Sequence, residues 1–314
     1  MSPKKPEEPV PFKIFDYGTI KEPMHGLQFN VERDLKKRSK ETTDEKTAGA
    51  YILMRVAVLF MKHLYNSIIF LVADEEAKGR HDEYIVSVPS ICRTMQEILF
   101  TVMYLGEDFP NRADQYYKAS WREHNEERGK YCNEYSTDPE WAPFLKTMKR
   151  GLTDGVQYLK LSEEESKNPQ REIAYVPIGM RLLESLSKEN QPFAKWLDKW
   201  FYQEVSAIAH FTPLGTVKIG AFLIKDVIPE ATPNKIAETL RSFKGFHSMM
   251  ATFVVLCTAS ELEHLFKLNN RDQIAKIWDK LRVVFTDAEE ICTRRYDKLL
   301  NMTRPQESRA KNPI

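Results

Sequence analysis

Residues 191–210 read QPFAKWLDKWFYQEVSAIAH, and the pattern of this stretch points to a helical fold. Large apolar side chains recur in it at steps of three and four residues, the period of an α-helix with one buried face. The positions that follow the pattern are Phe193, Trp196, Leu197, Trp200, Phe201, Val205 and Ile208. We therefore expect a helix over 192–209 that packs against other helices.

Similar patterns predict helices along most of the chain. Asp138-Pro139 and Thr232-Pro233 are typical helix starts, because a capping residue precedes a proline in the first turn. Only the weakly alternating segment 216–224 is a candidate strand. The sequence thus predicts an all-α bundle of about eight mostly long antiparallel helices. The expected helices cover 43–76, 89–105, 111–134, a shorter stretch after Asp138, 178–188, 192–209, 232–268 and 273–302.

The ends of the chain differ from the rest. The first 27 residues are rich in proline and aperiodic, and a run of charged residues follows them. We expect an extended or partly disordered arm over 1–42, a single all-helical domain over 43–303 and a mobile tail over 304–314.

Composition excludes several classes of protein. The 314 residues include 46 Lys+Arg against 45 Asp+Glu, a balance that argues against a dedicated DNA-binding protein. A hydrophobic share of 42% is too high for a disordered chain. The four cysteines form no CxxC pair, which favours reduced thiols in the cytoplasm. The apolar stretch 48–73 carries charged residues and 246–260 is short, so we expect buried helices and no membrane span.

Motifs for cofactors and metals are missing from the sequence. It contains no GxxxxGK[ST], GxGxxG, HExxH or GxSxG motif. Glu261-Leu-Glu-His264 has the ExxH spacing found in di-metal bundles, but a solvated Glu/His face of a helix is the simpler interpretation. We expect no metal and no cofactor.

Two segments place polar residues on apolar helices. Arg93 and Glu97 are four residues apart and can pair, either as an ordinary surface pair or as a buried pair with further hydrogen bonds. In Ser206-Ala-Ile-Ala-His210, the histidine ends an apolar helix. His210 can cap the last carbonyl groups of that helix, or act as an acid/base or ligand contact.

Taken together, the Arg-x-x-x-Glu helix and the segment Tyr202-x-x-x-Ser206-x-x-x-His210 resemble a bacterial all-helical family known mainly as a domain of unknown function. The resemblance covers roughly residues 45–300. It implies an all-α fold, a bacterial cytosolic setting and a polar site at which Arg93, Glu97 and His210 converge. It supplies no activity.

A second resemblance concerns Arg241-Ser-Phe-Lys-Gly-Phe-His247, which is similar to the loose Arg-x(4–6)-His motif of HEPN ribonucleases. These are all-helical proteins in which Arg and His act on RNA, usually at a dimer interface. Histidine can move a proton and arginine can stabilise phosphoryl charge without a metal. The Asn, Asp or His that often follows the arginine is missing here.

These features lead to two hypotheses about function. The first is a helical binding or sensor module for a ligand or protein partner, in bacterial stress response or phage defence, in which Arg93, Glu97 and His210 form the site with Tyr202 and Ser206. The alternative is a metal-independent endoribonuclease, a toxin or defence effector using His247 with Arg241 or His210 with Arg93. A homodimer fits either hypothesis, and a purely structural subunit is a third interpretation.

Overall fold

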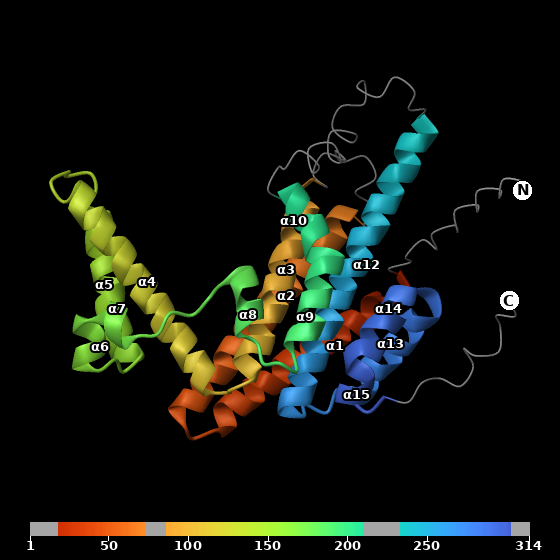
Figure 1. Cartoon of the computed structure of the whole chain (residues 1–314), viewed down its shortest axis with the longest axis horizontal. Coiled ribbons are helices and arrows are strands. Elements are labelled where there is room, and N and C mark those ends of the chain that lie inside the picture. Colours follow the sequence, from red (N-terminus) through yellow and green to blue (C-terminus); the bar gives the residue numbers. More distant parts are fainter. Residues whose placement is uncertain (1–17, 73–85, 210–232, 303–314) are drawn as a thin grey trace, which may run out of the picture. The chain divides into compact units, whose positions relative to one another are not determined.

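The computed structural model describes residues 18–72, 86–209 and 233–302, and this part of the chain is helical with no strand (Figure 1). The all-α prediction is confirmed. The candidate strand at 216–224, His210 and the tail over 304–314 lie outside the described residues. The longer helices are α1 (Gly18–Glu41), α2 (Glu45–Val72), α3 (Val88–Gly106), α4 (Asn111–Tyr135), α5 (Ala142–Tyr158), α12 (Pro233–Phe266) and α13 (Arg271–Val284).

Short helical segments complete the fold. Two of them are π-helical, η4 (Asp198–Tyr202) and η5 (Cys292–Tyr296). The others are α6 (Glu163–Lys167), α7 (Pro169–Glu172), the 3₁₀ turn η3 (Gly179–Arg181), α8 (Leu182–Ser185), α9 (Gln191–Leu197), α10 (Gln203–Ala209), α14 (Thr286–Ile291) and α15 (Asp297–Leu299).

The chain divides into two compact units, whereas the sequence predicts one domain over 43–303. Unit 1 contains residues 1–33, 58–99 and 193–314, and unit 2 contains 34–57 and 100–192. The candidate site residues that the structure describes belong to unit 1. Sequence patterns show which face of a helix is buried, but they do not show which helices share a core.

Three helix predictions need correction. An extended or partly disordered arm was expected over 1–42, but residues 18–41 form α1, because Met24, Leu27, Val31 and Leu35 recur at helical steps and are buried. The helix expected over 178–188 is reduced to η3 and α8, which ends at Ser185. One helix was expected over 273–302, but α13 ends before Phe285, whose backbone is extended with φ −127° and ψ 122°. The chain resumes as α14, η5 and α15.

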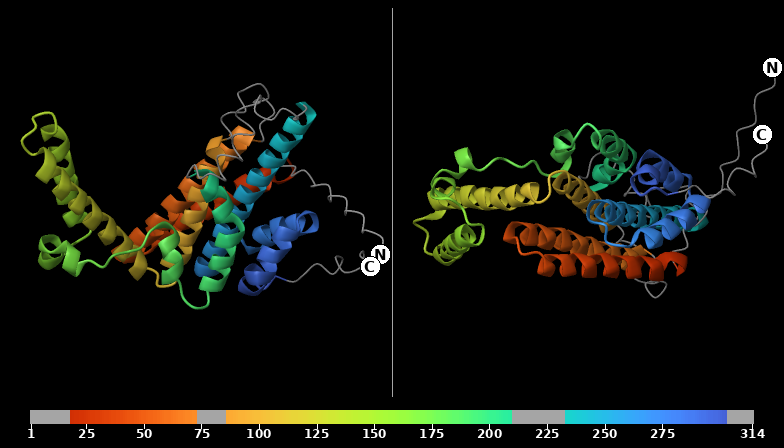
Figure 2. Two further views of the ribbon diagram at one scale, coloured as in Figure 1. Left: turned by 45° about the horizontal axis from the view of Figure 1, so that its top comes forward. Right: turned by 90° about the horizontal axis from the view of Figure 1, so that it is seen from below.

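Helix α12 is the central element of unit 1. Helices α1 and α2 lie along one side of it, and α9 lies along the other (Figure 2). Helix α13 packs against both α12 and α1, because Trp278 donates to Ser260 and Gln273 donates to the carbonyl of Pro23. Phe253 of α12 stacks between Trp200 and Trp278, with ring centroids 6.5 Å and 6.1 Å apart. By length and composition alone, α2 and α12 could each cross a membrane, but 89% of the apolar window of α12 is buried inside the protein, against 22% for α2. The apolar character of α12 is therefore explained by its place in the core.

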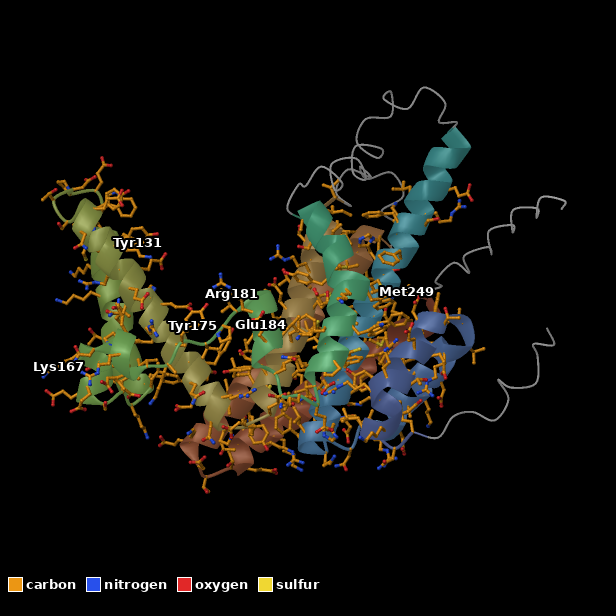
Figure 3. All side chains as sticks on the ribbon, viewed as in Figure 1. Tyr131, Lys167, Tyr175, Arg181, Glu184 and Met249 are labelled. Carbon is orange, nitrogen blue, oxygen red and sulfur yellow. The ribbon has the colours of Figure 1, made fainter. Side chains whose placement is uncertain are left out.

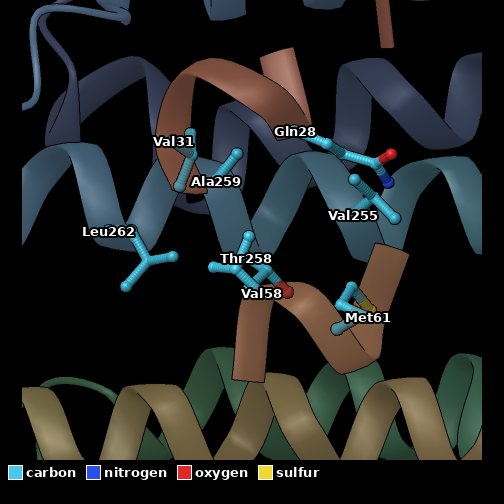
Figure 4. Close-up of a pocket in the computed structure, with 8 residues that line it drawn as sticks. All are labelled: Gln28, Val31, Val58, Met61, Val255, Thr258, Ala259 and Leu262. Carbon is cyan, nitrogen blue, oxygen red and sulfur yellow. The ribbon is translucent and has the colours of Figure 1, made fainter. Parts of the chain in front are cut away.

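A small cavity of about 20 Å³ lies on the first side of α12 (Figure 4). Gln28 of α1 lines it and is 4% exposed, and neither polar atom of its amide has a hydrogen-bond partner. Thr258 is the other polar residue of the lining, and its hydroxyl donates to the carbonyl of Val254. A cavity of this size is large enough for one water molecule. The remaining lining residues are Val31, Val58, Met61, Val255, Ala259 and Leu262.

In unit 2, α4 and α5 form a hairpin, and Tyr131 lies near the turn that joins the two helices (Figure 3). Trp121 of α4 donates its indole N–H to the carbonyl of Leu152, at 2.9 Å, and packs with Leu152 and Ile173. A Cβ atom at Gly155 would come within 2.6 Å of Cδ1 of Trp121. Glycine at this position therefore allows the indole to lie against α5.

Candidate functional site

Arg93, Glu97 and Tyr202 are joined to one another by three hydrogen bonds in unit 1. Nε of Arg93 donates to Oε1 of Glu97 at 3.1 Å and to Oη of Tyr202 at 2.8 Å. The Tyr202 hydroxyl donates to the same Oε1 at 2.9 Å. We call these three residues the Arg93 triad. The pair predicted from i,i+4 spacing is therefore extended by a residue that lies 109 positions from Arg93.

The Arg93 triad is partly open to solvent. The side chains of Arg93 and Glu97 are 26% and 30% exposed, whereas Tyr202 is 6% exposed. This position is intermediate between the two sequence alternatives, an ordinary surface pair and a buried pair with further hydrogen bonds. Burial, followed by the hydrogen bond to Glu97, raises the pKa of Tyr202, so its phenol is neutral at physiological pH.

The local helices explain this geometry. Val88–Gly106 is amphipathic, with buried Met95 and Leu99 on the face that packs into unit 1. Arg93 and Glu97 lie one turn apart beside that face. Tyr202 is the last residue of η4, a five-residue π-helical segment. π-helical turns inside α-helices are frequent at functional sites.

The other residues of the predicted site are only partly described. Ser206 lies in α10, four residues after Tyr202, and is half-buried. It therefore shares a helix face with Tyr202. His210 lies outside the described residues, so its convergence with Arg93 and Glu97 stays a prediction.

A second set of the same residue types occurs deeper in unit 1. Nε and Nη2 of Arg295 donate to the two carboxylate oxygens of Glu261, at 2.5 Å and 2.7 Å, and Tyr296 donates to Oε1 at 2.9 Å. We call this set the Arg295 triad. Its arginine and glutamate side chains are only 8% and 3% exposed, and Tyr296 is fully buried.

The two triads share one structural feature, because Tyr202 ends η4 and Tyr296 ends η5. They differ in accessibility: the Arg295 triad is bidentate and closed to solvent, as in a structural ion pair. The Arg295 triad could not be predicted from the sequence, because Glu261 and Arg295 are 34 residues apart and no local spacing connects them.

The Arg241 and His247 motif is split between solvent and core. Arg241 is exposed on α12, whereas His247 is 2% exposed, with Nδ1 2.9 Å from the carbonyl oxygen of Phe243. Six residues of α-helix turn through about 600°, so the two side chains lie on different faces. The structure does not bring these two residues together.

The described residues contain neither a candidate metal site nor, among the buried cysteines, a thiol favoured to ionise. No group of three or more His, Cys, Asp or Glu side chains that could hold a metal ion occurs in the part of the chain that the structure describes. Glu261 of the ExxH sequence is instead engaged by Arg295 and Tyr296. Burial raises the pKa of Cys92, Cys257 and Cys292 well above that of an ordinary thiol, which disfavours the reactive thiolate.

The chain matches no protein-family model, no curated protein and no solved structure. Its function therefore has to be argued from the geometry of the Arg93 triad.

Proposed function

We propose that this chain is a cytoplasmic binding or sensor module whose site is the Arg93 triad, with Ser206 at its edge. The observation that carries the proposal is the contrast between the two triads. The Arg295 triad is enclosed by the fold, whereas about a quarter to a third of the Arg93 and Glu97 side chains is exposed. The bacterial setting implied by the family resemblance belongs to the same proposal.

The charges of the Arg93 triad indicate the chemistry of its ligand. The guanidinium is a donor and the carboxylate an acceptor, and their opposite charges cancel. A small neutral or zwitterionic group that offers an acceptor to Arg93 and a donor to Glu97 matches this arrangement. Tyr202 is a neutral hydroxyl that orients both side chains.

A thermal-shift screen of small polar compounds tests the proposal. We expect compounds that raise the melting temperature of the wild type to have no effect on Glu97→Gln. Glu126→Gln is the matched control, because Glu126 accepts from Nε of Arg122 at i,i+4 spacing and is also 30% exposed. Compounds that act equally on wild type and Glu97→Gln would show that they bind elsewhere and would count against this site.

The ribonuclease alternative provides a second arm of the test. Purified protein is incubated with total RNA in EDTA, beside the His210→Ala variant. We expect intact RNA with both proteins. Cleavage by the wild type that is lost in His210→Ala would replace the proposed binding function with a nuclease.

A further inference from the structure

Gln96 lies directly beside the Arg93 triad in α3, and its side chain is fully buried. Its Nε2 donates to the carbonyl oxygen of Leu197 at 3.2 Å. Leu197 is the last residue of α9, immediately before the π-helical segment η4. A buried amide that makes few hydrogen bonds is costly compared with an apolar side chain of similar size. The hydrogen bond to Leu197 therefore indicates what this amide does.

The carbonyl of Leu197 lies where the helical repeat changes. In an α-helix each carbonyl accepts from the residue four positions later, and in a π-helix from the residue five positions later. The change of repeat disturbs the regular hydrogen bonds at the junction, so a carbonyl there benefits from a side-chain donor. Gln96 supplies such a donor from a neighbouring helix.

The register of η4 determines where Tyr202 points. One extra residue in a turn rotates everything that follows by about 100° relative to a continuous α-helix. If η4 became α-helical without a change in sequence, Tyr202 would turn away from Arg93 and Glu97 by that angle. Ser206, on the same face of α10, would turn with it.

We propose that Gln96 is a positioning residue that holds η4 in its π-helical register and thereby keeps Tyr202 in the Arg93 triad. The inference rests on the proposed function for its biological meaning, but its geometry can be tested without a ligand. Two neighbouring residues of α3 then act on Tyr202: Glu97 accepts its hydroxyl hydrogen bond, and Gln96 holds the segment in which it lies.

The test is a tyrosine titration by NMR of protein labelled with ¹³C at tyrosine Cζ, with Tyr202 assigned from the Tyr202→Phe variant. The wild-type pKa of Tyr202 is expected above 10. Gln96→Met keeps the approximate volume and removes the donor, and we expect the Tyr202 pKa to fall toward 10. Gln28→Met is the matched control, because Gln28 is a buried glutamine of the same unit that lines a cavity beside α12. We expect it to leave the Tyr202 signal unchanged.

Deletion of Lys199, an exposed residue within η4, provides a second background. The deletion removes the extra residue, so η4 becomes a regular α-helical turn with Tyr202 still in place. In this background Gln96→Met is expected to have no effect on the Tyr202 pKa.

The titration and the folding of the variants decide whether Gln96 holds the register of η4. An unchanged Tyr202 pKa in folded Gln96→Met would overturn the proposal. If Gln96→Met does not fold, folding of the double variant supports the register role and failure of the double variant refutes it. A failed ligand screen would leave these titration results intact, so the two proposals can fail independently.

Discussion

An Arg→Met substitution should reduce the free energy of unfolding by different amounts in the two triads. Arg295→Met keeps most of the volume of the side-chain stem but leaves Glu261, which is 3% exposed, without its cationic partner. Removing one partner of a buried ion pair costs about 3–5 kcal/mol. Arg93→Met removes a partner from Glu97, whose side chain is 30% exposed and can be hydrated. Because such a pair is partly screened, we expect a loss of about 1 kcal/mol or less.

Urea unfolding followed by far-UV circular dichroism measures both losses. We expect Arg295→Met to be less stable than Arg93→Met by about 2–5 kcal/mol, the difference between the two ranges. The remaining hydroxyl donors do not alter the order, since Tyr202 still reaches Glu97 and Tyr296 still reaches Glu261. Equal losses, or a larger loss for Arg93→Met, would refute the distinction between a structural and a functional triad.

Three further predictions concern single substitutions at Gly155, Gln28 and Tyr202. Gly155→Ala should destabilise the protein by about 1–3 kcal/mol, because the new Cβ would meet Trp121 at 2.6 Å. Gly151→Ala in the same helix meets nothing within 4 Å and should stabilise the protein by up to about 1 kcal/mol. Thermal unfolding of the two variants tests this, and a similar effect of both would be inconsistent with the close packing of Trp121. Gln28→Leu should leave the stability of the protein unchanged or increase it, because it removes two buried polar atoms that have no hydrogen-bond partner. A clear decrease in the free energy of unfolding, measured with urea, would show that a bound water satisfies the amide. The raised pKa of Tyr202 contributes stability that is fully present below pH 10 and is lost as the pH rises through the folded-state pKa. Tyr202→Phe should therefore lose less stability at alkaline pH than the wild type does. Parallel curves of unfolding free energy against pH for the variant and the wild type would contradict this.

Much of the fold could be predicted from the sequence, because the helical period is a local signal. Helix α3 was expected over 89–105 and is observed at Val88–Gly106, and α4 was expected over 111–134 and is observed at Asn111–Tyr135. The prediction for 18–41 was wrong although Met24, Leu27, Val31 and Leu35 carry the local helical period there. The break at Phe285 interrupts one expected helix, and no proline or glycine marks it in the sequence.

The candidate site could be predicted only in part. The i,i+4 spacing brought Arg93 and Glu97 together, but no spacing in the sequence places Tyr202 against them. No residue pattern distinguishes η4 or η5 from an ordinary α-helical turn, so the two π-helical segments were not anticipated. The role proposed for Gln96 follows from η4 and could not be derived before the segment was seen.

The rate of arginine modification tests the central claim most directly, because the claim is that solutes reach the Arg93 triad and not the Arg295 triad. Native protein is treated with a dicarbonyl reagent, and the modified fraction of each arginine is followed over time by peptide mass spectrometry. We predict that Arg93 is modified readily, that Arg295 reacts only after unfolding, and that Tyr202→Phe increases the rate at Arg93. Equal rates at the two arginines, or an Arg93 that reacts only in the unfolded protein, would contradict the account.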